Sequence, residues 1–274
     1  MSGGITENRA RLDSSAASVR SVFDARTVGS SHRRLAELLE PGQSVLDAGC
    51  GTGAITKGIA EAVGQEGRVV GIDNNDGLIS YARETFGGQE QEPLAFETAD
   101  IHYLPYRNEF DIVTTARVLQ WLADPRQALG QLIEAAKPGG RVIVLDYNHD
   151  KISWQPEPPP SMKAFYASFL KWRSDAGMRN GIADELPGVF ADLGLVDIRS
   201  SEQHEIVMRE DGNFLQQAGI WADVAATRGV QMVADGYLSE QERAAAEIEY
   251  RQWVQTEAVS QTMYMLAVEG VKPE

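Results

Sequence analysis

The sequence predicts an α/β fold with a doubly wound, mostly parallel sheet. Within residues 45–145, short apolar runs alternate with segments of helical periodicity, which is typical of repeated βαβ units. The runs are apolar on both faces, as expected for central strands of a sheet covered by helices on each side. The runs expected to be strands are Val45-Leu46, residues 69–72, Ile112-Val113 and residues 142–145.

The helices between these strands are predicted from apolar residues repeated on one face. Ile55, Ile59 and Val63 follow the spacing i, i+4, i+8. Two further sets have helical spacing: Leu78, Ala82 and Phe86, then Leu129, Leu132, Ile133 and Ala136. Right-handed crossovers through these helices place any ligand beyond the carboxyl ends of the strands.

The segments on either side of this core are less regular. An apolar helix face at Leu35, Leu38 and Leu39 ends at Pro41-Gly42, and residues 1–18 are expected to be mobile or to form a helix on binding. After a proline-rich break at residues 156–160, a one-sided helix carries Met162, Phe165, Tyr166, Phe169 and Trp172. A strand is then expected at 195–198, continuing through 204–207, with helices near 213–228 and 239–255 and a strand at 262–268.

These patterns predict a division of the chain into a core and two insertions. Residues 1–150 are expected to form N-terminal helices and a ligand-binding core, with a helical lid at 151–183. Residues 184–208 return to the core, 209–255 form a second helical insertion, and 256–274 supply the closing strand.

Composition narrows the class of protein. The 274 residues have a formal net charge of −15, which disfavours nucleic acid as a partner because such proteins usually present a basic face. No apolar run approaches the roughly 20 residues of a membrane span, and the N-terminus lacks a signal-peptide pattern, so a cytoplasmic protein is expected. The single cysteine, Cys50, is expected to be a buried filler, and four scattered histidines suggest no metal site. A monomer or a homodimer is expected.

A glycine-rich loop follows the first strand, in the stretch V-L-D-A-G-C-G-T-G at residues 45–53. Such a loop lets the backbone approach a ligand closely, and the glycine spacing alone also fits dinucleotide binding. Asp47 separates the two possibilities, since its carboxylate would repel a pyrophosphate in a poorly solvated cleft. The alternative is that Asp47 caps the following helix. A ligand with a positive end is therefore expected, and a nicotinamide oxidoreductase is disfavoured.

Acidic residues also follow the second and third strands. Asp73 is placed to accept hydrogen bonds from two ribose hydroxyls. Asp100 could accept from the exocyclic amine of an adenine, with Ile101 as an apolar wall. The fourth strand runs out at residues 114–117, beside the other end of the same ligand.

With these stretches in view, the sequence resembles the class I S-adenosylmethionine-dependent methyltransferases, especially the small-molecule branch that includes ubiquinone and menaquinone biosynthesis enzymes. The cofactor carries an ammonium and a sulfonium and no phosphate, as the Asp47 argument requires. The matching stretches cover about residues 42–145. They are V-L-D-A-G-C-G-T-G, V-V-G-I-D, A-D-I-H-Y-L-P-Y, F-D-I-V-T-T-A-R-V-L-Q-W-L-A-D-P and K-P-G-G-R-V-I-V.

The resemblance implies a Rossmann-like methyltransferase fold of seven strands, the last antiparallel, and a set of cofactor contacts. Ala48, Gly49 and Gly51 would contact the methionine moiety, beside Asp47, and Ala116 and Arg117 its amino-acid end. Asp73, with the adjacent Asn74, would bind the ribose, and Asp100 and Ile101 the adenine. The pair His102-Tyr103 departs from the small or acidic residues usual in relatives.

Methyl transfer needs a nucleophile aligned with the methyl carbon and shielded from water. If the acceptor is an alcohol, phenol or acidic carbon, Asp146 and His149 are candidate general bases, although His149 could instead be a solvated loop residue. Candidate substrate residues are Tyr147, Phe169, Trp172 and Trp221, whose aromatic rings could line an acceptor pocket or only pack the lid. A small-molecule acceptor is expected. The alternatives are a protein methyltransferase and a non-catalytic S-adenosylmethionine-binding regulator, and the choice of O-, N- or C-methylation stays open.

Overall fold

The computed structural model describes residues 24, 26–87 and 93–274, so the predicted N-terminal segment 1–18 lies outside the described residues. The chain forms two compact units. We call the part that contains the described residues up to Asp146, Ile182–Gln203 and Leu266–Glu274 the core unit. The second unit contains Tyr147–Gly181 and His204–Met265.

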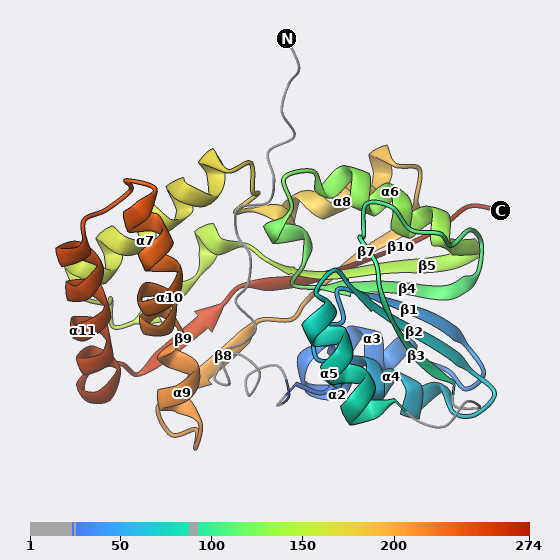
Figure 1. Ribbon diagram of the computed structural model, residues 1–274, viewed down its shortest axis with the longest axis horizontal. Coiled ribbons are helices and arrows are strands. Elements are labelled where there is room, and N and C mark those ends of the chain that lie inside the picture. The colour runs from blue at the N-terminus through green and yellow to red at the C-terminus, as the bar shows by residue number, and fades with distance from the viewer. Residues whose placement is uncertain (1–23, 25, 88–92) are drawn as a thin grey trace, which may run out of the picture. The chain divides into compact units, whose positions relative to one another are not determined.

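The core unit is built on a seven-stranded sheet with the order β3-β2-β1-β4-β5-β10-β7 (Figure 1). Strands β1 to β5 pair in parallel, and β10 runs antiparallel to β7. The doubly wound sheet with an antiparallel last strand is thus confirmed. The strand bounds are β1 Ser44–Ala48, β2 Arg68–Asp73, β3 Leu94–Thr98, β4 Phe110–Ala116, β5 Ala136–Tyr147, β7 Val196–Glu202 and β10 Met265–Val271.

Helices cover both faces of this sheet, with α4 and α5 on one face and α6 and α8 on the other (Figure 1). Their starts follow local chemistry: the Asn75 side chain accepts from the first turn of α5, and Asp124 caps α6 ahead of Pro125. The bounds are α2 Val28–Ser31, α3 Arg33–Leu38, α4 Ala54–Val63, α5 Asp76–Phe86, α6 Pro125–Ala135 and α8 Ile182–Asp192, with a 3₁₀ turn, η1, at Leu119–Trp121.

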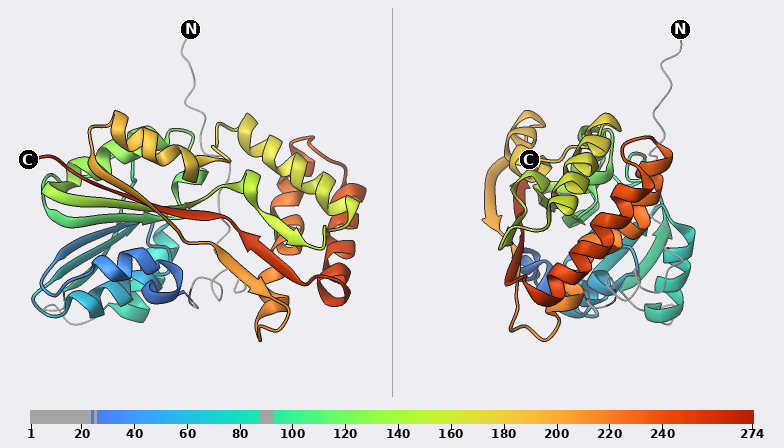
Figure 2. Two further views of the ribbon diagram at one scale, coloured as in Figure 1. Left: turned by 180° about the vertical axis from the view of Figure 1, so that it is seen from behind. Right: turned by 90° about the vertical axis from the view of Figure 1, so that its left-hand side faces the viewer.

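The second unit packs helices α7, α10 and α11 against one another and adds a three-stranded sheet of order β6-β9-β8 (Figure 2). The aromatic face predicted for residues 162–172 is buried on α7. The bounds are η2 His149–Lys151, β6 Ser153–Gln155, α7 Pro160–Asp175, β8 Glu205–Met208, α9 Phe214–Ala218, α10 Ile220–Ala234, α11 Glu240–Thr256 and β9 Ser260–Met263.

Two strands expected to be continuous are each divided between the two sheets. β7 ends at Glu202 and β8 begins at Glu205, while β9 ends at Met263 and β10 begins at Met265. At these breaks the backbone bonds leave the ladders: the amide of Met265 donates to Nδ1 of His204 (3.1 Å), and the amide of Asn148 donates to the carbonyl of Tyr264 (3.0 Å). Each break is set by pairing with partners in two different sheets, and an extended segment read without its partners predicted one strand.

Candidate functional site

The glycine loop between β1 and α4 is fixed by backbone bonds and by packing. The amides of Gly49 and Cys50 both donate to the carbonyl of Ile72 (2.7 and 2.9 Å), which ties the loop to the end of β2. Gly49, Gly51 and Gly53 have φ values of 82°, 56° and 82°, in the left-handed region that favours glycine. Cys50 is buried against Ile79, Ala82 and Phe96, which confirms its role as a filler.

The three loop glycines have different surroundings. A Cβ on Gly49 would lie 2.3 Å from Cγ2 of Val118, and one on Gly53 would lie 2.7 Å from the ring of Phe96. A Cβ on Gly51 would meet no atom within 4 Å. Gly49 and Gly53 therefore serve close packing, whereas the loop at Gly51 is open to the approach of a ligand.

Asp47 is buried at the end of β1, with its side chain beside the glycine loop. Its Oδ2 accepts a hydrogen bond from the hydroxyl of Thr56 (2.7 Å), the third residue of α4. Burial raises the pKa of this carboxyl from 3.8 to about 6; the Thr56 bond opposes the rise, and the nearby charge of Asp73 adds to it. The N-cap of α4 is Gly53, so the helix-capping alternative for Asp47 is wrong.

Asp73 at the end of β2 links the glycine loop to the next helix. Its Oδ2 accepts from the amide of Gly51 (3.0 Å) and its Oδ1 from the amide of Asn75 (2.9 Å). Burial raises the pKa of Asp73, and these backbone bonds oppose the rise. A carboxylate offers about four acceptor positions, so capacity remains for hydroxyl donors of a ligand. The adjacent Asn74 is exposed.

Asp100 and Ile101 follow β3. Oδ1 of Asp100 accepts from the amide of His102 (2.9 Å) and lies 2.9 Å from Nδ1 of the same histidine. Among the described residues Oδ2 of Asp100 has no hydrogen-bond partner, and the side chain of Asp100 is 50% exposed. Ile101 is buried. His102 thus holds the carboxylate of Asp100 in one orientation, a contact that the sequence did not reveal.

Ala116 ends β4, and Arg117 follows it with a φ of 62°, unusual for a residue other than glycine. The amide of Arg117 donates to the carbonyl of Leu145 (2.7 Å), which holds this conformation. Its guanidinium Nη2 donates to the carbonyl of Ser31 (3.1 Å). Arg117 is buried. Burial, and then the charge of Arg117, lower the pKa of the neighbouring His32, a residue that sequence reasoning missed.

The two candidate bases lie in different units. Asp146, in the core unit, is fully buried and accepts from the amide of Gln120 (3.1 Å). His149, in the second unit, is only 4% exposed, so the solvated-loop alternative is wrong. Burial, and then the charge of Arg173, lower the pKa of His149 well below 6.5, which keeps its imidazole neutral.

The four aromatic residues expected to contact substrate are buried in the second unit. Trp221 lies centrally, with ring centroids 4.7 Å from Tyr166 and 5.6 Å from Phe169. The indole Nε1 of Trp172 donates to Asp235 (2.8 Å), and the hydroxyl of Tyr147 donates to Glu205 (3.2 Å). These side chains form the interior of the unit, and their contact with a substrate stays a prediction.

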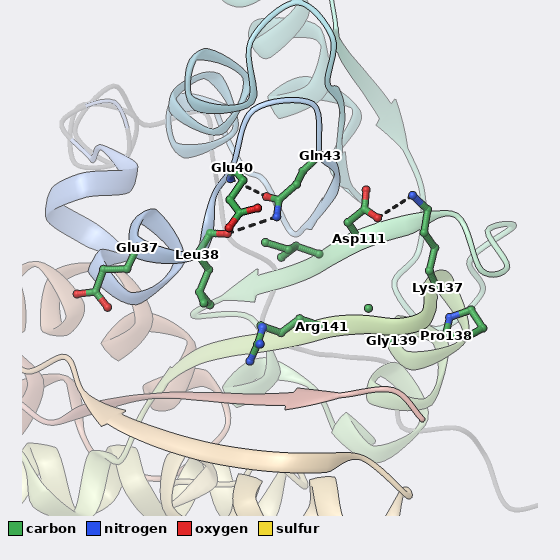
Figure 3. A pocket seen from close by; sticks show the side chains of 11 residues that line it. Glu37, Leu38, Glu40, Gln43, Asp111, Lys137, Pro138, Gly139 and Arg141 are labelled. Carbon is green, nitrogen blue, oxygen red and sulfur yellow. Dashed lines mark hydrogen bonds and ion pairs between the residues drawn. The ribbon is translucent and has the colours of Figure 1, made fainter. Parts of the chain in front are cut away.

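A cavity of about 400 Å³ lies at the other end of the core sheet, at the amino ends of β1, β4 and β5 (Figure 3). Its wall includes the ion pair between Lys137 and Asp111 (2.7 Å) and the side chain of Gln43. The segment at residues 137–140 thus lies at the start of β5, away from the carboxyl ends of the strands. Within the described ranges, no group of three or more His, Cys, Asp or Glu side chains is arranged to hold a metal ion.

Comparison with known proteins shows which family the sequence matches. Residues 39–205, more than half of the chain, match the family model described as a methyltransferase domain. A demethylmenaquinone methyltransferase from Shouchella clausii is 27% identical over 58% of the chain and 73% of its own length. The ubiquinone/menaquinone biosynthesis C-methyltransferase UbiE from Teredinibacter turnerae is 37% identical over 40% of the chain and 45% of its own length.

Solved structures agree on the fold. Phosphoethanolamine N-methyltransferase 2 from Haemonchus contortus, solved with S-adenosyl-L-methionine, aligns with a TM-score of 0.55 at 17% identity, over 89% of the chain and 53% of that protein. The matches span about half the length of most of the curated relatives. No helix among the described residues is long and apolar enough to cross a membrane.

The chain belongs to the methyltransferase domain family. More particularly, its fold and motifs are those of the class I S-adenosylmethionine-dependent methyltransferases. The residues fit this cofactor: the loop is open at Gly51, and the carboxylates of Asp47 and Asp73 flank it, where they suit a cationic ligand without phosphate.

Proposed function

We propose that the chain transfers the methyl group of S-adenosylmethionine to a small-molecule acceptor. The observation that carries the proposal is the row of carboxylates at the ends of the first three strands, with the open turn at Gly51 between Asp47 and Asp73. Similarity to enzymes named for menaquinone and ubiquinone biosynthesis supports a small acceptor. The bound cofactor supplies an electrophilic methyl group for in-line displacement.

The residues of the core unit divide the work of holding the cofactor. Asp73 accepts from the ribose hydroxyls while it keeps its bonds to the amides of Gly51 and Asn75. Oδ2 of Asp100 accepts from the adenine amine, with Ile101 against the ring. Asp47 stabilises the positive charge of the methionine end, and Ala48, Gly49 and Gly51 present backbone to it. Ala116 and Arg117 complete this end.

Proton removal from the acceptor falls to Asp146 or His149 in this proposal. His149 is neutral, as a base must be, but its burial makes it a weak one. Asp146 is a buried carboxylate with a backbone donor. If Asp146 is the base, the Asp146→Asn variant has no turnover at any pH. If His149 is the base, the Asp146→Asn variant retains turnover.

The second unit selects the acceptor in this proposal, with residues 151–183 and 209–255 acting as a lid. Its interior is aromatic, and the indole Nε1–H of Trp221 is buried without a partner among the described residues, so this donor is available to an oxygen of the acceptor. Tyr147, Phe169 and Trp172 are the neighbouring candidates. The cytoplasmic location and the monomeric or homodimeric state stay predictions.

The experiment is a screen of acceptors with S-adenosylmethionine labelled at the methyl carbon. Phenols, quinols, amines and acidic-carbon compounds are tested beside peptide and protein acceptors. Label in a small molecule, lost in Asp73→Ala, is the expected result. Label only in protein acceptors contradicts the choice of substrate class. Binding of the cofactor without transfer to any acceptor class favours the non-catalytic alternative.

A further inference from the structure

His32 lies between α2 and α3 in the core unit, where no sequence motif pointed to it. Its side chain is 1% exposed, and its Nε2 lies 3.2 Å from the hydroxyl oxygen of Thr114 on β4. Burial, and then the charge of Arg117, lower the pKa of His32 to about 3. The imidazole is therefore neutral at physiological pH and carries a single proton.

The other ring nitrogen of His32 is not satisfied. Nδ1 is buried and has no hydrogen-bond partner among the described residues. If the Thr114 hydroxyl donates to Nε2, the proton is on Nδ1, which becomes a buried N–H donor without an acceptor. Leaving such a group unpaired costs about 1–3 kcal/mol, so an acceptor from outside the protein is expected there.

The surroundings of His32 connect it to the glycine loop. Arg117 donates to the carbonyl of Ser31, the residue before His32, and its charge acts on the imidazole. The next residue, Val118, packs against Gly49, where an added Cβ would lie 2.3 Å from Cγ2 of Val118. His32 is thus connected through Ser31, Arg117 and Val118 to the glycine loop.

A guanidinium beside a neutral N–H donor is a suitable receptor for a carboxylate. The buried carboxylates of Asp47 and Asp73 suit the ammonium and sulfonium instead. We propose that Nδ1–H of His32 binds the carboxylate of the cofactor's methionine moiety, beside Arg117. The proposal rests on S-adenosylmethionine being the cofactor, as in the proposed function.

The test compares two ligands that differ in the amino-acid end. S-adenosylhomocysteine carries the carboxylate, and 5′-methylthioadenosine lacks the whole amino-acid portion. By calorimetry, His32→Leu is expected to weaken S-adenosylhomocysteine about tenfold or more, in line with the loss of a hydrogen bond to a charged group. Binding of 5′-methylthioadenosine should change less than twofold, and His32→Gln, which retains an N–H donor, should restore part of the loss.

Thr114→Val is the matched control, since it removes the hydroxyl that sets the tautomer of His32 without removing the imidazole. It is expected to show a smaller loss with the same ligand selectivity. Equal weakening of both ligands in His32→Leu would mean that His32 only supports the fold of the site. Unchanged binding of both ligands in His32→Leu would mean that Nδ1 bonds to water and not to the cofactor. Either outcome overturns the proposal.

A measurement on the wild-type protein keeps the test independent of the variants' folding. The Nδ1 proton of His32, observed by nitrogen-15 NMR, should shift downfield with S-adenosylhomocysteine and stay in place with 5′-methylthioadenosine. An equal response to both ligands contradicts the assignment. If the wild type binds neither ligand, the proposed function fails; if it binds both and only the selectivity is absent, the role of His32 alone fails.

Discussion

At the scale of single residues, Asp47 has the least favourable environment among the cofactor candidates. Its carboxyl is buried beside that of Asp73, and its pKa is raised from 3.8 to about 6. Because the folded state holds this proton more tightly than the unfolded chain, the cost of ionisation is absent below pH about 4 and fully present above pH about 6. At neutral pH the cost reaches roughly 3 kcal/mol as an upper bound.

Asp47→Asn is therefore expected to stabilise the protein without ligand. The amide keeps an acceptor for Thr56 and removes the charge, so the free energy of unfolding should rise by about 1–3 kcal/mol at pH 8 and change little at pH 4. The same variant should bind S-adenosylmethionine more weakly. Urea unfolding at both pH values checks the first expectation, and an equal shift at pH 4 and pH 8 would mean that the carboxyl is not strained by burial.

Some residues of the candidate site could be predicted from the sequence, and others could not. Asp47 and Asp73 lie at the ends of β1 and β2, and Asp100 lies just after β3, each within a recognisable motif, so their positions followed from the order of the strands. His32 lies outside every motif and reaches Thr114 only through the fold, across 82 positions of sequence. His149 was hard to place for a related reason, since the segment after β5 gave no sign that it enters a buried aromatic cluster.

At the scale of elements, the turn from β1 to α4 contains one glycine that is needed for packing and another that faces open space. Gly49 and Gly51 both have positive φ, so an alanine at either position is strained by about 1–2 kcal/mol. Only Gly49 would also collide with Val118, whereas the space in front of Gly51 is open. Alanine variants at these two positions therefore share the same backbone strain and differ only in what the added methyl group meets.

Gly49→Ala is expected to lower stability more than Gly51→Ala, because Val118 and the turn after β4 must move to admit the methyl group. Gly51→Ala should reduce cofactor affinity by a larger factor than the stability loss explains, since its Cβ enters the space left for the ligand. Denaturant midpoints together with calorimetry check both. Equal stability losses, with cofactor affinity unchanged in Gly51→Ala, would show that the open space is not the ligand's.

Elements also show where periodicity suffices and where it fails. The strands β1, β2, β4 and β5 and the helices between them were predicted because each apolar pattern belongs to one sheet or one helix face. The segments 195–208 and 260–271 each supply strands to two sheets. Tertiary pairing decides that division, and no local signal marks it.

At the scale of the whole molecule, we propose that the core unit binds the cofactor and that the second unit selects the acceptor. Phe169 is buried in the second unit, and Phe169→Ala would leave a cavity that costs about 3–5 kcal/mol. Phe169→Leu is the gentler change. It is expected to alter acceptor turnover or preference and to leave S-adenosylmethionine affinity within a few fold.

The control for that prediction is Ile248→Ala, on the exposed surface of α11 in the same unit. It should change neither acceptor preference nor cofactor affinity. Steady-state turnover with two acceptors of different size, beside cofactor titrations, makes the comparison. If Phe169→Leu reduces cofactor affinity as strongly as it affects turnover, the division of labour between the units is wrong.

The most direct test of the central claim is a calorimetric titration of the wild-type chain with S-adenosylhomocysteine, S-adenosylmethionine and NAD. We expect binding of the first two at one site per chain and no binding of NAD at comparable concentration. Asp73→Ala should weaken binding by roughly 1.5–3 kcal/mol, since it removes a charged acceptor for the ribose hydroxyls. Tight binding of NAD with no response to S-adenosylmethionine would contradict the account, and so would unchanged affinity in a folded Asp73→Ala variant.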